Sequence, residues 1–79
     1  MKTFSDDIIS DQQFTSESLP KGKYLCYEFK NCSFQSSKLL DIEFVECVYK
    51  DCDLSLCVIG NTAFKDVKFI NCKLLGGEF

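Results

Sequence analysis

The chain has 79 residues, with nine Lys and twelve Asp or Glu, a formal net charge of −3, and neither Arg, His nor Trp. Without Arg it lacks the forked donor that reads guanine edges and clamps phosphate, and without His it has no base for a Ser-His or Cys-His pair. We therefore expect no direct nucleic-acid contact, no enzymatic activity, no cofactor and no small-molecule substrate.

The hydrophobic residues are not arranged for a membrane or for secretion. No run of about 18 apolar residues occurs, and Asp6 and Asp7 interrupt the segment in which a signal peptide would be apolar. These features predict a soluble, cytoplasmic protein that does not bind membranes and whose cysteines stay reduced.

Taken in chain order, residues 1–11 come first and are predicted to form an N-terminal cap, because Asp7 falls where the following pattern would point inward. From Gln12 to Phe79 the chain has a five-residue period, which differs from the periods of a helix and of a strand and so requires a turn at fixed intervals. Every fifth residue, here called the centre, is Phe, Leu, Tyr or Ile and is predicted to lie in the core. The centres are Phe14, Leu19, Tyr24, Phe29, Phe34, Leu39, Phe44, Tyr49, Leu54, Ile59, Phe64, Phe69, Leu74 and Phe79.

The residue two before each centre, here called the slot, is mostly small or apolar from Tyr27 onward and is never charged there. Charged residues occupy the other three positions, so two residues in five are predicted to point inward. Five of the six cysteines fall in slots, and only Cys26 does not. We interpret the slot as a small buried apolar site that free Cys fills, rather than as a disulfide or metal framework. The predicted small inward slots are Cys32, Ser37, Cys47, Cys52, Cys57, Thr62, Val67, Cys72 and Gly77.

The segments Cys32-Ser33-Phe34-Gln35-Ser36 and Cys52-Asp53-Leu54-Ser55-Leu56 show the repeat most clearly. They resemble the motif of the pentapeptide-repeat family, and the resemblance covers residues 12–79. It implies an all-β fold, a right-handed quadrilateral parallel β-helix with four repeats in each coil, here about 3.4 coils. Residues 20 apart would then stack. The sequence agrees, because aromatic centres recur at that spacing, as in Phe29, Tyr49 and Phe69.

The last centre, Phe79, has no polar segment behind it, so the C-terminal coil is expected to be open. An open coil exposes strand edges and core side chains, so we expect that another chain covers it, that the sequence is a fragment of a longer solenoid, or that a homodimer forms through this coil, and of these we predict the homodimer. Several outward apolar residues could also form a patch that binds a partner, in which Leu25 lies one coil from Val45. The predicted interaction surface consists of Leu25, Val45, Val48, Val58, Leu74 and Phe79.

Three functions stay open at this point. The first is a non-enzymatic scaffold or protein-interaction module. The second follows from the family resemblance: its quinolone-resistance members mimic DNA and bind type II topoisomerases such as gyrase, although a charge of −3 gives only a weak acidic field. The third is a redox or metal sensor built from the cysteines. Their spacing is unfavourable for a metal site, because each cysteine occupies a separate slot whereas zinc ligands come in close pairs that converge on one point.

Overall fold

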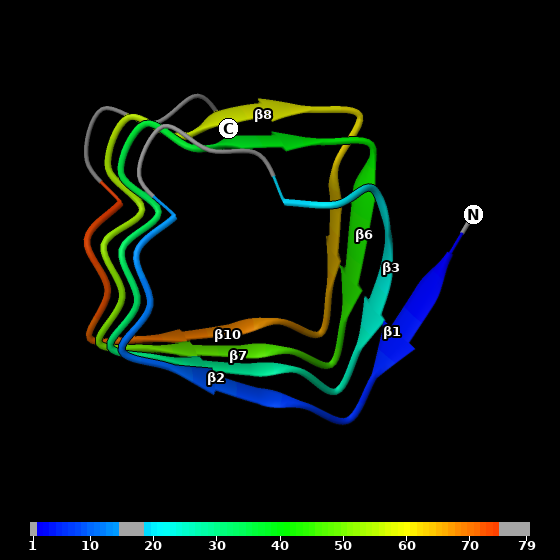
Figure 1. The fold of residues 1–79 in the computed structure, drawn as a ribbon, viewed down its shortest axis with the longest axis horizontal. Helices are drawn as coiled ribbons and strands as arrows, with labels where there is room; N and C mark the ends of the chain where they lie inside the picture. Colours follow the sequence, from blue (N-terminus) through cyan, green and yellow to red (C-terminus); the bar gives the residue numbers. More distant parts are fainter. Residues whose placement is uncertain (1, 15–18, 75–79) are drawn as a thin grey trace.

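The computed structural model describes residues 2–14 and 19–74, and it confirms the predicted all-β solenoid, with about three turns. Viewed along the stack the chain has a four-sided outline (Figure 1). No helix occurs among the described residues, so none of them forms a helix that could cross a membrane. The strands are β1 (Thr3–Ser5), β2 (Ile8–Ser10), β3 (Gly22–Leu25), β4 (Glu28–Lys30), β5 (Lys38–Leu40), β6 (Ile42–Val45), β7 (Val48–Lys50), β8 (Val58–Gly60), β9 (Ala63–Lys65) and β10 (Lys68–Ile70).

All strand pairs are parallel and join residues 20 apart, as the stacking prediction required. One face holds the order β1-β3-β6-β9, the next β2-β4-β7-β10, and a third β5-β8. The fourth, here called the bridge face, has isolated bridges that link Gln13, Ser33, Asp53 and Lys73 in sequence. Each face therefore presents columns of side chains from successive coils.

Most described corners between faces are formed by a residue with a left-handed backbone, and these residues fall at five-residue spacing; Lys21, which shares that spacing, is not left-handed. Their φ angles lie between 51° and 60°, a region in which Asn and Asp are the most tolerated residues after Gly. Eight of the twelve are indeed Asp or Asn, which explains how a five-residue repeat turns without glycine. The corners are Asp6, Asp11, Cys26, Asn31, Ser36, Asp41, Glu46, Asp51, Leu56, Asn61, Asp66 and Asn71.

The core is a set of stacked aromatic columns inside the four faces. The centres from Leu19 to Leu54 are all buried. The rings of Phe29 and Tyr49 stack with centroids 4.8 Å apart, and those of Tyr49 and Phe69 stack at 5.1 Å. Phe44 stacks on Phe64 in the same way at 5.3 Å. This repeated burial of large rings is the main apolar contribution to stability.

The predicted N-terminal cap differs from the observed arrangement. Strands β1 and β2 lie within residues 1–11, and they pair in register with β3 and β4. Phe4 stacks on Tyr24 with a centroid distance of 4.8 Å, so the segment already follows the repeat. Asp7, which suggested a break, is exposed and accepts a hydrogen bond from the Ile8 amide at 2.8 Å. The solenoid therefore begins before residue 12, and an acid at an end coil is tolerated because that position stays in water.

Candidate interaction surfaces

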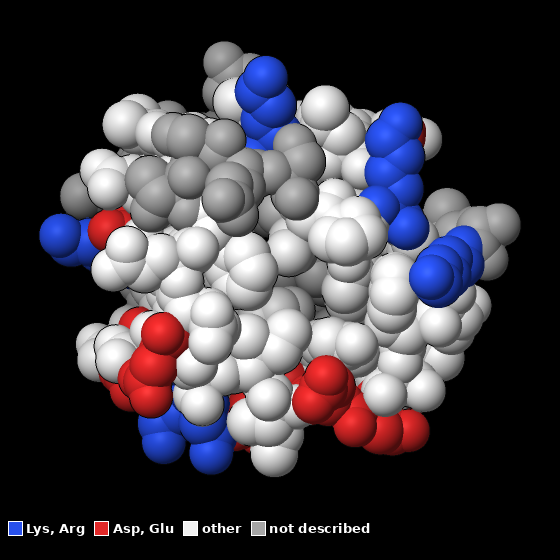
Figure 2. Space-filling view, in the orientation of Figure 1, with Lys and Arg blue, Asp and Glu red and all other residues white. Residues whose placement is uncertain are grey.

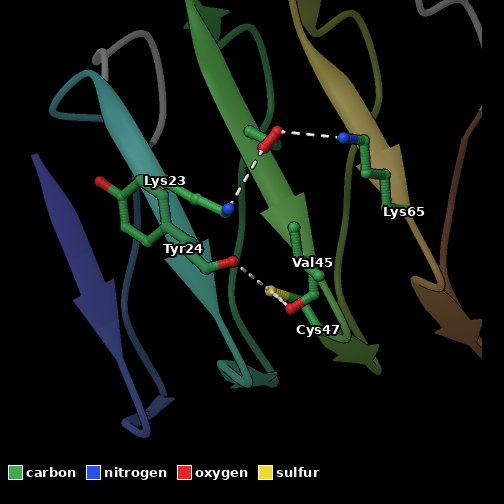
Figure 3. Close-up of polar contacts among 6 residues, drawn as sticks. Lys23, Tyr24, Val45, Cys47 and Lys65 are labelled. Carbon is green, nitrogen blue, oxygen red and sulfur yellow. Dashed lines mark hydrogen bonds and ion pairs between the residues drawn. The ribbon is translucent and has the colours of Figure 1, made fainter. Parts of the chain in front are cut away.

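The buried slots have a chemical role that their small size did not reveal. Each slot cysteine donates its S–H to the carbonyl of the residue 23 positions earlier, in the coil below. The Cys52 Sγ lies 3.2 Å from the Phe29 oxygen and the Cys57 Sγ 2.9 Å from that of Phe34. Figure 3 shows the same bond from Cys47 to Tyr24, at 3.4 Å. The interpretation of the slot as purely apolar is thus wrong, because it holds small side chains that donate.

Residues of other types follow the same rule. Ser37 donates its hydroxyl to the Phe14 carbonyl, and Thr62 donates to that of Leu39. Val67 lies in a slot without a donor and is half-buried, and Gly77 falls outside the described residues. A hydroxyl and a thiol are thus interchangeable here, which explains why Cys, Ser and Thr share the slots.

Burial disfavours the thiolate form of three slot cysteines. Burial raises the pKa of Cys52 and of Cys57 to about 11, and it raises the pKa of Cys47 as well. A thiolate is the nucleophilic and metal-binding form, so thiols with raised pKa values react slowly near neutral pH. Within residues 2–14 and 19–74 no group of His, Cys, Asp and Glu has a metal-binding arrangement.

Cys26 differs from the slot cysteines because it forms an exposed corner. Its Sγ lies 3.6 Å from the Glu46 Oε2, in the corner of the next coil. Desolvation and the Glu46 carboxylate raise the pKa of this thiol. Its surroundings are therefore the opposite of the electropositive ones that activate a cysteine.

Four residues of the predicted interaction surface are divided among three faces of the solenoid. Leu25 and Val45 pair on neighbouring strands β3 and β6. Val48 belongs to β7 on the next face, and Val58 to β8 on the β5-β8 face. Corners separate these faces, and the merging of the four residues into one patch stays a prediction. Phe79 lies outside the described residues.

The C-terminal coil is open in a way that no inner coil is. Phe69 and Leu74 are 37% and 38% exposed, whereas Tyr49 and Leu54, one coil below them, are 0% and 3% exposed. Beside Phe69, Ile70 is 47% exposed. Strands β8, β9 and β10 each pair on one side only in the described part of the chain. We call β8, β9, β10 and the centres Phe64, Phe69 and Leu74 the C-terminal end.

The outer faces carry charges of both signs that neutralise one another between coils. On the face of β3 and β6, the Glu43 carboxylate lies 3.9 Å from the Lys23 Nζ and 3.3 Å from the Lys65 Nζ (Figure 3). At the corners, Asn31 donates to Asp11 at 2.8 Å and Asn71 to Asp51 at 2.6 Å. The longest dimension of the chain is 27 Å, less than one turn of a DNA duplex, about 34 Å.

The bridge face has a depression, but carboxylates in it already accept hydrogen bonds from neighbouring residues. A depression of about 310 Å³ is lined by polar residues that include Asp11, Asn31, Asp51 and Asp53. Asp11 accepts from Asn31, and Asp53 accepts from the amide and hydroxyl of Ser55. The bonds from Ser55 lower the pKa of Asp53. Asp11 and Asp53 are thus already engaged with neighbouring side chains.

Comparison with known proteins adds no family to this description. No protein-family model matches the sequence, and no curated protein matches it.

Proposed function

We propose that the chain is a non-enzymatic protein-interaction module of the pentapeptide-repeat type, and that it contacts its protein partner through the C-terminal end. The observation that carries the proposal is the exposure of Phe69 and Leu74, at 37% and 38%, where the residues one coil below are buried. Core-type side chains exposed next to unpaired strands are the two features that a protein partner covers together.

The family assignment is supported by features that are independent of the opening periodicity. The corners turn through Asp and Asn at five-residue intervals, the slots hold small donors, and strands pair 20 residues apart. All six cysteines are free, which suits a cytoplasmic protein in which thiols stay reduced.

The chemistry of the C-terminal end favours strand addition. Parallel strands β9 and β10 present backbone donors and acceptors at the edge of two adjoining faces, and the centres between them supply apolar area. Main-chain pairing gives affinity in such contacts, and the side-chain columns give specificity. The partner is therefore expected to contribute an extended or β-solenoid segment.

Site-specific photocrosslinking tests the proposal with a matched pair of positions. Ile70 and Lys50 occupy the same outward column and pair in register, but Ile70 lies in the terminal coil and Lys50 one coil inside. A benzophenone amino acid at Ile70 should crosslink to protein, either in the purified chain or in lysate, whereas the same probe at Lys50 should not. Equal crosslinking at both positions, or none at Ile70, would show that the C-terminal end is not a contact surface.

A further inference from the structure

We infer that the occupant of the C-terminal end is the N-terminal end of a second copy, so that copies stack head to tail along the solenoid. The inference rests on the proposed function and names the partner of the same surface. Strands β1 and β2 pair on one side only among the described residues, as β9 and β10 do at the other end of the stack (Figure 1). Both ends thus offer free strand edges on the same two faces.

The register of the chain continues across such a contact. Because residues 20 apart pair, β1 of the second copy would follow β9 and its β2 would follow β10. Phe4 of the second copy would then stack on Phe64, as Phe64 stacks on Phe44. Phe4 and Phe64 are both half-buried in the single chain. Only the head-to-tail orientation keeps the strands parallel, as in every pairing within the chain.

The two ends carry opposite charge. Residues 2–14 contain one Lys and three Asp, a formal charge of −2. Residues 62–74, the equivalent segment three coils later, contain three Lys and one Asp, a formal charge of +2. The end of the stack that faces the viewer in Figure 2 has an uncharged middle with charged side chains at its periphery. Head-to-tail stacking therefore brings apolar centres together and joins unlike rims.

A symmetric dimer would not match in this way. Two C-terminal ends in contact would set +2 against +2, and two N-terminal ends would set −2 against −2. Like charges at an interface suppress the wrong partner, so the charge distribution favours the heterologous contact over the homodimer through the C-terminal coil.

One corner column supports the same arrangement. Asp11, Asn31, Asp51 and Asn71 alternate acid and amide, and a second copy's Asp11 would follow Asn71 and continue the alternation. In another column, Asp66 would meet Asp6 of the second copy. Lys65 and Lys68 lie close to Asp66 in sequence on either side and offset that repulsion. Because the contact repeats by translation, the association is open-ended, and the average size of the assemblies rises with protein concentration.

Two charge-altered variants test the inference. Asp6→Asn with Asp7→Lys changes residues 2–14 from −2 to +1, and Asn keeps a residue that tolerates the left-handed corner. Lys68→Glu with Lys73→Gln changes residues 62–74 from +2 to −1, and neither Lys forms an ion pair among the described residues. Circular dichroism melts establish that each variant folds, before its mass is measured by sedimentation over a range of concentrations.

The wild-type chain should show a mass that rises with concentration, and raising salt from about 0.05 to about 0.5 M should weaken association at least about tenfold. Each variant alone should sediment as a monomer, because its two ends now have the same sign. An equimolar mixture should associate again, because each variant's ends complement the other's. A wild-type monomer, a dimer that does not grow, or a mixture that stays monomeric would overturn the inference.

The result is separable from the proposed function. If the Ile70 probe crosslinks to a different protein in lysate while the mixture of variants stays monomeric, the C-terminal end is a contact surface but its partner is not a second copy. If neither experiment is positive, both proposals fail.

Discussion

Replacing Tyr49 by Phe should stabilise the protein. Tyr49 is fully buried, with its ring stacked between Phe29 and Phe69, and its hydroxyl has no hydrogen-bond partner among the described residues. A buried hydroxyl without a partner has lost its water and gained nothing in return, at a cost of about 1–3 kcal/mol. Phe keeps the stacked ring and removes that cost. The small void left by the missing oxygen is destabilising and offsets part of the stabilisation. We expect the free energy of unfolding to rise by about 1–2 kcal/mol. For a chain of this size, each kcal/mol corresponds to a rise in Tm of roughly 4–8 °C.

Tyr24→Phe is the matched control. Tyr24 is also a buried centre, but its hydroxyl donates to the Pro20 carbonyl at 2.7 Å. The same chemical change should therefore destabilise the protein, by about 1 kcal/mol. Urea unfolding followed by circular dichroism measures both variants under one set of conditions. If Tyr49→Phe lowers the unfolding midpoint as Tyr24→Phe does, the Tyr49 hydroxyl is satisfied and the reasoning is refuted.

Substitutions at three further positions test the slots and corners. Cys52→Ala should lower the free energy of unfolding by about 2 kcal/mol, because a cavity replaces the sulfur and its hydrogen bond to the Phe29 carbonyl is lost. Cys52→Ser keeps a donor and should cost less than about 1 kcal/mol. Urea unfolding measures both variants. Leu56→Asn should stabilise by about 1 kcal/mol, since Leu56 is 53% exposed with φ 58°; an unchanged midpoint would contradict this. Asn61 donates to Asp41 at 2.8 Å and lowers the pKa of that carboxyl. Asn61→Gly should raise the Asp41 pKa in an NMR titration. A carboxyl whose pKa is lower in the folded than in the unfolded state stabilises the fold above the unfolded pKa, and this stability is lost as the pH falls through the folded value. The variant should therefore lose less stability than the wild type as the pH falls below about 4.

The periodicity of the sequence was enough to predict the coil and its core. Tyr24, Phe44 and Phe64 share a column in the structure because a repeat of 20 residues returns the chain to the same face. That inference needed only the positions of large apolar residues, which burial fixes strongly.

Other features depend on backbone geometry or on long-range neighbours that the pattern does not encode. Leu56 and Glu46 adopt left-handed backbone conformations at corners although neither residue type signals one, because the pairing of successive coils fixes where the chain turns. The slot bonds were missed because the acceptor of Cys52 lies 23 residues away and is a backbone carbonyl. The placement of Val45, Val48 and Val58 on different faces likewise depends on where the corners fall.

The pairing of residues 20 apart limits how this chain can change in length during evolution. An insertion of one residue would exchange inward and outward positions in everything that follows it. An insertion of five would keep the inward positions but move each later strand to the next face, so that Asn71 would leave the column in which it donates to Asp51. Only a duplication or loss of 20 residues preserves both the core and the columns. The gene is therefore expected to vary in whole coils, with point substitutions between them.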